Sequence, residues 1–139
     1  MQVTVETLVN APIENVWEAW TTPAVIQQWN AASDDWCCPK AEIDLHEGGL
    51  FDYRMESKTG AQGFNFSGHF TRLKLLQRIE YTLKDGRQVA IFFSETADGV
   101  LITETFDTSS EYSTEAEKEG WQSILNYFKQ IVETNQYLS

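Results

Sequence analysis

The side chains best suited to chemistry in this 139-residue chain are two cysteines and two histidines, and their spacing does not form a site. Cys37 and Cys38 are neighbours, and a disulfide between adjacent residues would strain the peptide that joins them. His46 and His69 are the only histidines, and no spaced Cys/His motif of the kind that holds zinc connects the four residues. The sequence therefore predicts two free thiols, no metal site and no cofactor.

Catalysis has little support in the residue pattern. His69 could act as a general base only with a carboxylate or a substrate proton within about 3 Å. The period of two places it opposite Phe66 and Phe70, on the polar face of its strand. Asp34 and Asp35 could pair as carboxylates, but in this loop they indicate a solvated turn. Because no Ser-His-Asp order, glycine-rich phosphate loop or nucleophile elbow is present, we predict no catalytic residues.

Aromatic side chains are abundant. They make up 13% of the sequence and include five tryptophans and eight phenylalanines. Large flat rings fill protein cores, and they also line the apolar pockets that bind small molecules. Composition does not separate these two roles, so the elements that carry the rings have to be considered next.

The charge balance is strongly acidic, with a formal net charge of −11 and a pI of about 4.5. A surface of this charge repels phosphate backbones and anionic lipid headgroups, which argues against nucleic acid and membrane partners. Residues 1–6 alternate like a strand and lack the basic and then apolar start of a signal peptide. No apolar run approaches the roughly 20 residues that span a bilayer. We therefore expect a cytoplasmic protein.

The longest predicted element is an amphipathic helix from Thr114 to Tyr137. Its apolar side chains recur at the i, i+3, i+4 and i+7 spacing of one helix face: Trp121, Ile124, Leu125, Phe128, Ile131 and Val132. Thr114 and Glu117 have the spacing of a capping box, and Gly120 indicates a close backbone approach near the helix start. The apolar stripe has to be covered, and a β-sheet is the only large partner that the sequence offers.

The rest of the chain predicts that sheet and two short helices. A strand over 2–10 precedes two helices that begin at Pro12 and Pro23, and a loop over 30–39 follows. Alternating apolar residues and turn signals then predict six strands, which begin near Ala41, Phe51, Phe64, Arg78, Val89 and Val100. The order β-α-α-β(×6)-α indicates an α+β fold in a single domain, residues 1–139.

Four segments in order along the chain carry a family resemblance: NAPIENVWEAWTTPAVIQQWN (10–30), DLHEGGLFDYRM (44–55), GHFTRLKLLQRIEYTL (68–83) and EGWQSILNYFKQIVE (119–133). Together they resemble the START-like (SRPBCC) helix-grip superfamily, and within it the family related to the activator of the Hsp90 ATPase. The resemblance implies a curved antiparallel sheet of six to seven strands around a long C-terminal helix, with two short helices near the N-terminus. It also implies a cavity between sheet and helix, which in the wider superfamily holds lipids, sterols, polyketides or plant hormones.

His46 departs from the family pattern. The family usually has a basic residue, often Arg, at this position before the glycine pair, in an Asp-x-Arg-x-Gly-Gly pattern. If that basic side chain makes a structural ion pair, histidine replaces it only in part near neutral pH. If it contacts a ligand, a different ligand is expected for this chain.

We predict that eight residues line the cavity and bind its ligand: Trp36, Phe51, Tyr53, Phe66, Tyr81, Trp121, Leu125 and Phe128. Polar side chains that could also face inward are Tyr53, Arg54, His69, Tyr81 and Glu104.

The favoured function is binding of a small hydrophobic or aromatic molecule, lipids included, by a cytosolic protein. One alternative is a co-chaperone-like module with a protein partner, related to the Hsp90 ATPase activators. The other is a cyclase-, dehydratase- or hydrolase-like enzyme with polar groups of shifted pKa in the cavity.

Overall fold

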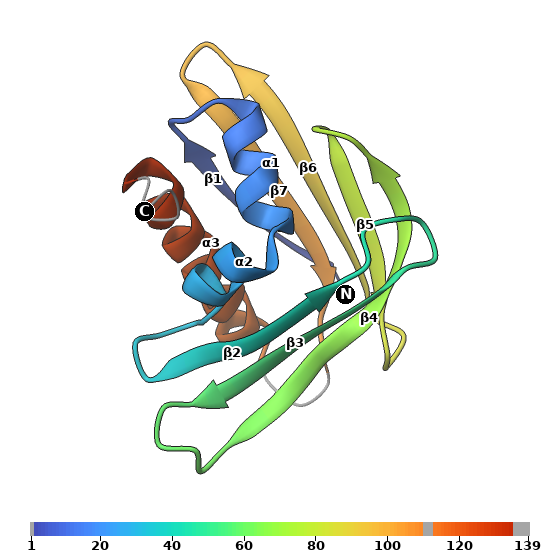
Figure 1. Cartoon of the computed structure of the whole chain (residues 1–139), viewed down its shortest axis with the longest axis vertical. Helices are drawn as coiled ribbons and strands as arrows, with labels where there is room; N and C mark the ends of the chain where they lie inside the picture. Colours follow the sequence, from blue (N-terminus) through green and yellow to red (C-terminus); the bar gives the residue numbers. More distant parts are fainter. Residues whose placement is uncertain (1, 110–112, 135–139) are drawn as a thin grey trace.

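A seven-stranded antiparallel sheet is the main element of the fold (Figure 1). The computed structural model describes residues 2–109 and 113–134. Across the sheet the strands are ordered β1-β7-β6-β5-β4-β3-β2, so the first strand pairs with the last and each later strand with its chain neighbour. Their bounds are β1 Gln2–Val9, β2 Trp36–Ile43, β3 Leu50–Ser57, β4 Gly63–Lys74, β5 Arg78–Leu83, β6 Gln88–Thr96 and β7 Gly99–Asp107.

The helices of the described residues are α1 Ile13–Thr21, α2 Pro23–Trp29 and α3 Thr114–Thr134. Figure 1 shows the sheet curving around α3, with α1 and α2 beside it. The predicted end of the long helix at Tyr137 lies outside the described residues. The element order and the curved sheet confirm the predicted α+β helix-grip fold.

The strand β2 begins earlier than the sequence predicted. It starts at Trp36 instead of Ala41, so the predicted loop over 30–39 was too long. The pairing of β2 with β3 shifts register between Cys37 and Lys40, and Pro39 lies within this interruption. Proline cannot donate to the ladder and is tolerated at bulges and on edge strands such as β2. Because the bulge interrupts the alternation of side chains, the period of two did not predict the first residues of the strand.

The predicted capping box of Thr114 and Glu117 does not form, and other hydrogen bonds stabilise the start of α3. The Oγ atom of Ser113 accepts a hydrogen bond from the Ala116 N–H at 3.1 Å, so Ser113 is a capping residue. The Glu117 carboxylate instead accepts the N–H of Ser109, at 2.9 and 3.0 Å from its two oxygens. The capping-box prediction was wrong because Glu117 stabilises the segment before the helix.

A tryptophan-rich cluster from α1 and α2 covers one part of α3. Phe128 contacts Trp20 and Trp29, with ring centroids 4.8 and 5.0 Å apart. Trp29 Nε1 donates a buried hydrogen bond to the Ala19 carbonyl at 2.9 Å, which fixes α2 against α1. Phe93 of β6 contacts Trp20 from the sheet at 5.8 Å. These contacts anchor α3 to the short helices and the sheet together.

Gly120 provides a test of how α3 lies on the sheet. A Cβ atom at this position would have no heavy atom within 4 Å outside the adjacent helix backbone, so the predicted close approach was wrong. Alanine loses less backbone freedom on folding than glycine. Gly120→Ala is therefore predicted to raise the free energy of unfolding by about 0.5–1 kcal/mol, as measured by urea denaturation.

Gly68→Ala is the matched control of opposite sign. A Cβ atom at Gly68 would lie 2.1 Å from the Thr82 carbonyl oxygen, so this variant should lose stability. A Gly120→Ala variant that is no more stable than the wild type would contradict the open environment of Gly120.

Candidate functional site

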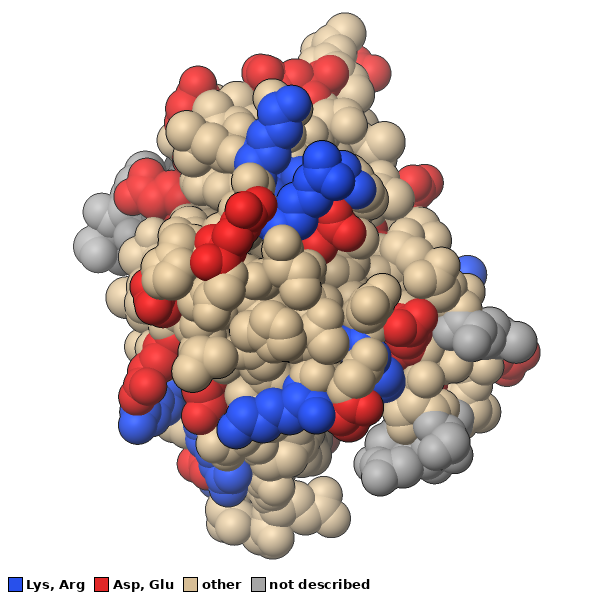
Figure 2. All heavy atoms as spheres, turned by 90° about the vertical axis from the view of Figure 1, so that its right-hand side faces the viewer, with Lys and Arg blue, Asp and Glu red and all other residues tan. Residues whose placement is uncertain are grey.

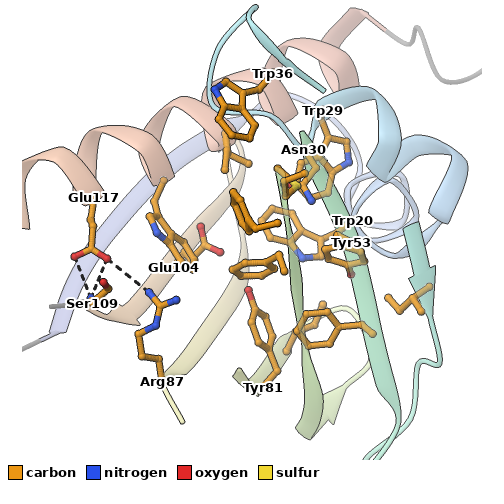
Figure 3. Close-up of a pocket in the computed structure, with 18 of the residues that line it drawn as sticks. Trp20, Trp29, Asn30, Trp36, Tyr53, Tyr81, Arg87, Glu104, Ser109 and Glu117 are labelled. Carbon is orange, nitrogen blue, oxygen red and sulfur yellow. Dashed lines mark hydrogen bonds and ion pairs between the residues drawn. The ribbon is translucent and has the colours of Figure 1, made fainter. Parts of the chain in front are cut away.

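A cavity of about 710 Å³ lies between the inner face of the sheet and α3 (Figure 3). Ten of the 21 residues that line it are aromatic: Trp20, Trp29, Trp36, Phe51, Tyr53, Phe64, Phe66, Phe70, Tyr81 and Trp121. Phe64 is 50% exposed, so the cavity reaches the surface beside the turn between β3 and β4. A volume of this size is typical of sites that hold drug-sized ligands, at about 300–1,000 Å³.

Six of the eight predicted lining residues lie on the cavity: Trp36, Phe51, Tyr53, Phe66, Tyr81 and Trp121. They come from β2, β3, β4, β5 and α3. Across β3 and β4, Tyr53 is paired with Phe66 in the sheet register. Trp121 of α3 meets Phe66 with ring centroids 5.9 Å apart. The structure thus brings these rings together, and their role in binding remains a prediction.

Leu125 and Phe128 do not lie on the cavity. Both are fully buried in the core, and the rings of Trp20 and Trp29 lie directly against Phe128. Trp121 and Ile124, closer to the helix start, are the α3 side chains of the apolar stripe that reach the cavity. The helical period identifies the apolar face of α3, but it carries no information on where along that face the cavity ends.

The carboxyl group of Glu104, one of the polar groups that the sequence allowed to face inward, lies on the cavity wall. Buried residues alternate along β7 as Val100, Ile102, Glu104 and Phe106, so the acid occupies an inward position. Glu104 is 5% exposed, and no described residue donates a hydrogen bond to its carboxyl group. Burial raises its pKa from 4.5 to about 8. An acidic residue within an apolar alternation is the sequence signal that could have added Glu104 to the predicted site.

Tyr81 and Tyr53 bring two phenol groups to the same cavity. Burial raises the pKa of both above the ordinary tyrosine value, and the nearby Glu104 carboxyl raises that of Tyr81 further. Both phenols are therefore neutral near pH 7 and can donate or accept a hydrogen bond. Figure 3 shows the Tyr81 hydroxyl pointing into the cavity.

A polar network lies at the end of the cavity where α3 begins (Figure 3). The guanidinium of Arg87 lies 2.8 Å from Asp85, between Nε and Oδ2, and 3.6 Å from Glu117, between Nη1 and Oε1. Glu117 is 8% exposed and also accepts the Ser109 N–H. The network joins the β5–β6 turn and the end of β7 to α3. The network was not predicted from the sequence, because charged residues in turns give no periodic signal.

Two other polar candidates lie away from the cavity. His69 is exposed on β4, and Arg54 pairs with a neighbouring carboxylate on β3 at 3.0 Å. His46 is also exposed, with its Nε2 atom 2.9 Å from Asp44 Oδ2. A hydrogen bond to the Glu47 carbonyl and the charge of Asp44 raise the pKa of His46. This geometry favours the ion-pair role of His46 over contact with a cavity ligand.

The cysteines and loop acids form no further site. Cys37 and Cys38 are free, and burial raises the pKa of Cys38 to about 11, which makes its thiol a poor nucleophile. Asp34 accepts a hydrogen bond from the Tyr127 hydroxyl at 2.6 Å.

Across residues 2–109 and 113–134, no group of three or more His, Cys, Asp and Glu is placed to hold a metal ion. None of the helices in these ranges combines the length and apolar content that crossing a bilayer requires.

A curved antiparallel sheet around one long helix, with an aromatic-lined cavity between them, defines a START-like helix-grip protein. The family model described as "Activator of Hsp90 ATPase homolog 1-like protein" matches residues 10–133. The chain belongs to this family.

Solved structures from several bacteria resemble the chain over almost its whole length. The AHSA1-like protein from Aeromonas hydrophila is 38% identical, with a TM-score of 0.91, covering 97% of this chain and 94% of that one. Chr148 from Cytophaga hutchinsonii is 42% identical, with a TM-score of 0.83 and coverages of 99% and 96%. CV1439 from Chromobacterium violaceum shares the fold at 22% identity, with a TM-score of 0.87 and coverages of 96% and 98%. No curated protein matches the sequence.

Buried Glu104 predicts a stability that depends on pH. An acid whose pKa is raised by folding binds its proton more tightly in the folded state. The contribution of the protonated Glu104 carboxyl to the free energy of unfolding is complete below pH 4.5, its pKa in the unfolded chain. This contribution is lost as the pH rises through about 8, its pKa in the folded protein. As the pH rises from about 5 to about 8.5, Glu104→Gln should therefore become progressively more stable than the wild type, by an amount that grows to the order of 2–4 kcal/mol at the upper end.

Urea denaturation at several pH values measures this gain. Glu6→Gln on the exposed side of β1 is the control, because it removes the same charge without altering a buried group. If the stability difference between Glu104→Gln and the wild type were the same at every pH, Glu104 would not carry the raised pKa.

Proposed function

We propose that residues 1–139 form one START-like domain of a cytoplasmic protein that binds a small hydrophobic or aromatic molecule, such as a lipid, in its cavity. The observation that carries this proposal is the cavity of about 710 Å³ with ten aromatic side chains in its wall. Apolar cavities of this size, with a few polar groups among the lining residues, are the usual binding sites for small molecules. The acidic net charge of −11 argues against nucleic acid and against anionic membranes as partners.

Contacts among the lining rings support a preformed site. Phe51 lies 5.2 Å from Tyr53 and 4.8 Å from Tyr81, measured between ring centroids. Trp121 stacks on Phe106 at 4.1 Å with an interplanar angle of 6°. Rings that are held by their neighbours lose little further freedom when a ligand binds, which lowers the entropic cost of binding.

The protein-interaction alternative has less support. It predicts a contiguous apolar or acidic surface patch, whereas Figure 2 shows Lys and Arg side chains next to Asp and Glu on the face in view. The pair of Lys40 with Glu42 at 2.8 Å is one example along an edge strand. Exposed pairs of this kind contribute little energy, but they interrupt the acidic surface that a basic partner would need.

The enzyme alternative draws on one observation, the carboxyl group of Glu104 with its pKa of about 8. Acid–base catalysis also needs a reacting group within hydrogen-bond reach of that carboxyl. Mass spectrometry of a compound recovered after incubation with the protein separates the two functions. An unchanged compound supports binding, and a converted compound supports the enzyme.

Ile124 offers a direct test of binding in the cavity. This side chain lines the cavity from α3, so Ile124→Trp should occupy part of the volume and weaken binding by at least about tenfold. Ile131 lies on the same helix, packs against the core and does not line the cavity. Ile131→Trp is therefore the matched control, and it should change the affinity by less than about twofold.

Binding compounds are first found by following the tryptophan fluorescence of the wild type against a panel of hydrophobic and aromatic molecules. The affinities of both variants are then compared by calorimetry, since each substitution adds a fluorophore. Lack of saturable binding to the wild type, or an equal loss in the two variants, would overturn the proposal.

A further inference from the structure

The Glu104 carboxyl group has no partner in the described part of the chain, although the residue is only 5% exposed. It lies between the buried side chains of Ile102 and Phe106 on β7 and lines the cavity. A buried polar group without a hydrogen-bond partner costs free energy relative to its hydrated state. An apolar side chain would make a more stable fold at this position. A ligand group that enters the cavity and binds the carboxyl would account for its presence.

The neighbouring charges indicate the sign of that ligand group. Arg87 is the only cationic side chain among the described residues that line the cavity. Its guanidinium is already paired with Asp85 at 2.8 Å and lies 3.6 Å from Glu117. An ionised Glu104 therefore adds a negative charge that the protein does not compensate. A cationic group would stabilise the ionised form of Glu104 and supply the missing charge, whereas a carboxylate or phosphate gains no ion pair with Glu104 in either of its protonation states.

The aromatic rings that line the cavity with Glu104 favour a ligand that combines a cationic group with an apolar body. Tyr81 and Trp121 line the cavity together with Glu104. Trp121 stacks on Phe106, which is two residues from Glu104 on the same face of β7. The faces of such rings attract cations, and their hydrophobic surface accommodates hydrocarbon.

We propose that the ligand is a hydrophobic amine whose ammonium group pairs with the Glu104 carboxylate while its apolar body lies against the aromatic wall (Figure 3). This inference rests on the proposed function, because it names the chemical class of ligand for the same cavity. An ammonium group has several N–H donors, so the Tyr81 hydroxyl oxygen can accept a second hydrogen bond beside Glu104. A fatty acid forms no such ion pair with Glu104 and is therefore expected to bind more weakly than the amine.

Three compounds with one body and different head groups test the inference: para-butylbenzylamine, para-butylbenzyl alcohol and para-butylbenzoate. Calorimetric titration of the full chain near neutral pH compares their affinities. The amine should bind at least about tenfold more tightly than the alcohol, and the benzoate should bind most weakly.

The variant Glu104→Gln tests whether the Glu104 carboxylate causes the preference for the amine over the alcohol. In this variant the affinity for the amine should fall to that for the alcohol, while the affinity for the alcohol changes by less than about threefold. Glu6→Gln removes one exposed charge and should keep the order of the three affinities. An amine that binds no better than the alcohol, or an advantage that survives in Glu104→Gln, overturns the inference and leaves the proposed function in place. If none of the three compounds binds, the inference is also overturned. If no compound of the wider hydrophobic and aromatic panel binds either, the proposed function fails as well.

Discussion

The fold depends on how the apolar face of α3 is covered along its length. Leu125, Phe128 and Val132 are fully buried, and the tryptophans of α1 and α2 pack against Phe128. Nearer the helix start, Trp121 and Ile124 face the cavity instead. A twisted sheet curves away from a straight helix, so space remains where the short helices do not fill it. The same amphipathic helix thus completes the core at one end and forms part of the cavity wall at the other.

The polar groups at the cavity end contribute differently to stability and to function. Glu117 and Arg87 are satisfied by each other and by Asp85 and Ser109, so they hold the start of α3 against the turns of the sheet. Glu104 has no such structural partner among the described residues. Buried polar groups that lower stability without organising the fold are typical of functional sites, where stability is given up for recognition.

Much of the fold could be predicted because its main elements follow simple periods. The stripe from Trp121 to Val132 identified α3, and alternation identified the strands that carry Phe51, Tyr53 and Phe66. The start of β2 was missed because the bulge near Pro39 breaks that alternation.

The site was harder to predict because its contacts join residues far apart in the sequence. Whether Phe128 faces a cavity or the core depends on Trp20 and Trp29, about a hundred positions away. The contact of Arg87 with Glu117 likewise joins a turn to a helix and leaves no local pattern. Glu104 did leave a signal, since its strand places it inward between apolar residues.

An isotope-filtered NOE experiment on labelled protein with a bound hydrophobic compound tests the central claim most directly, because it locates the ligand atoms. The account predicts NOEs from the ligand to Trp121, Phe66 and Tyr81, with none to the buried side chains of Leu125 and Phe128. NOEs confined to exposed side chains such as Leu50 and Leu75 would show binding on the surface and contradict it.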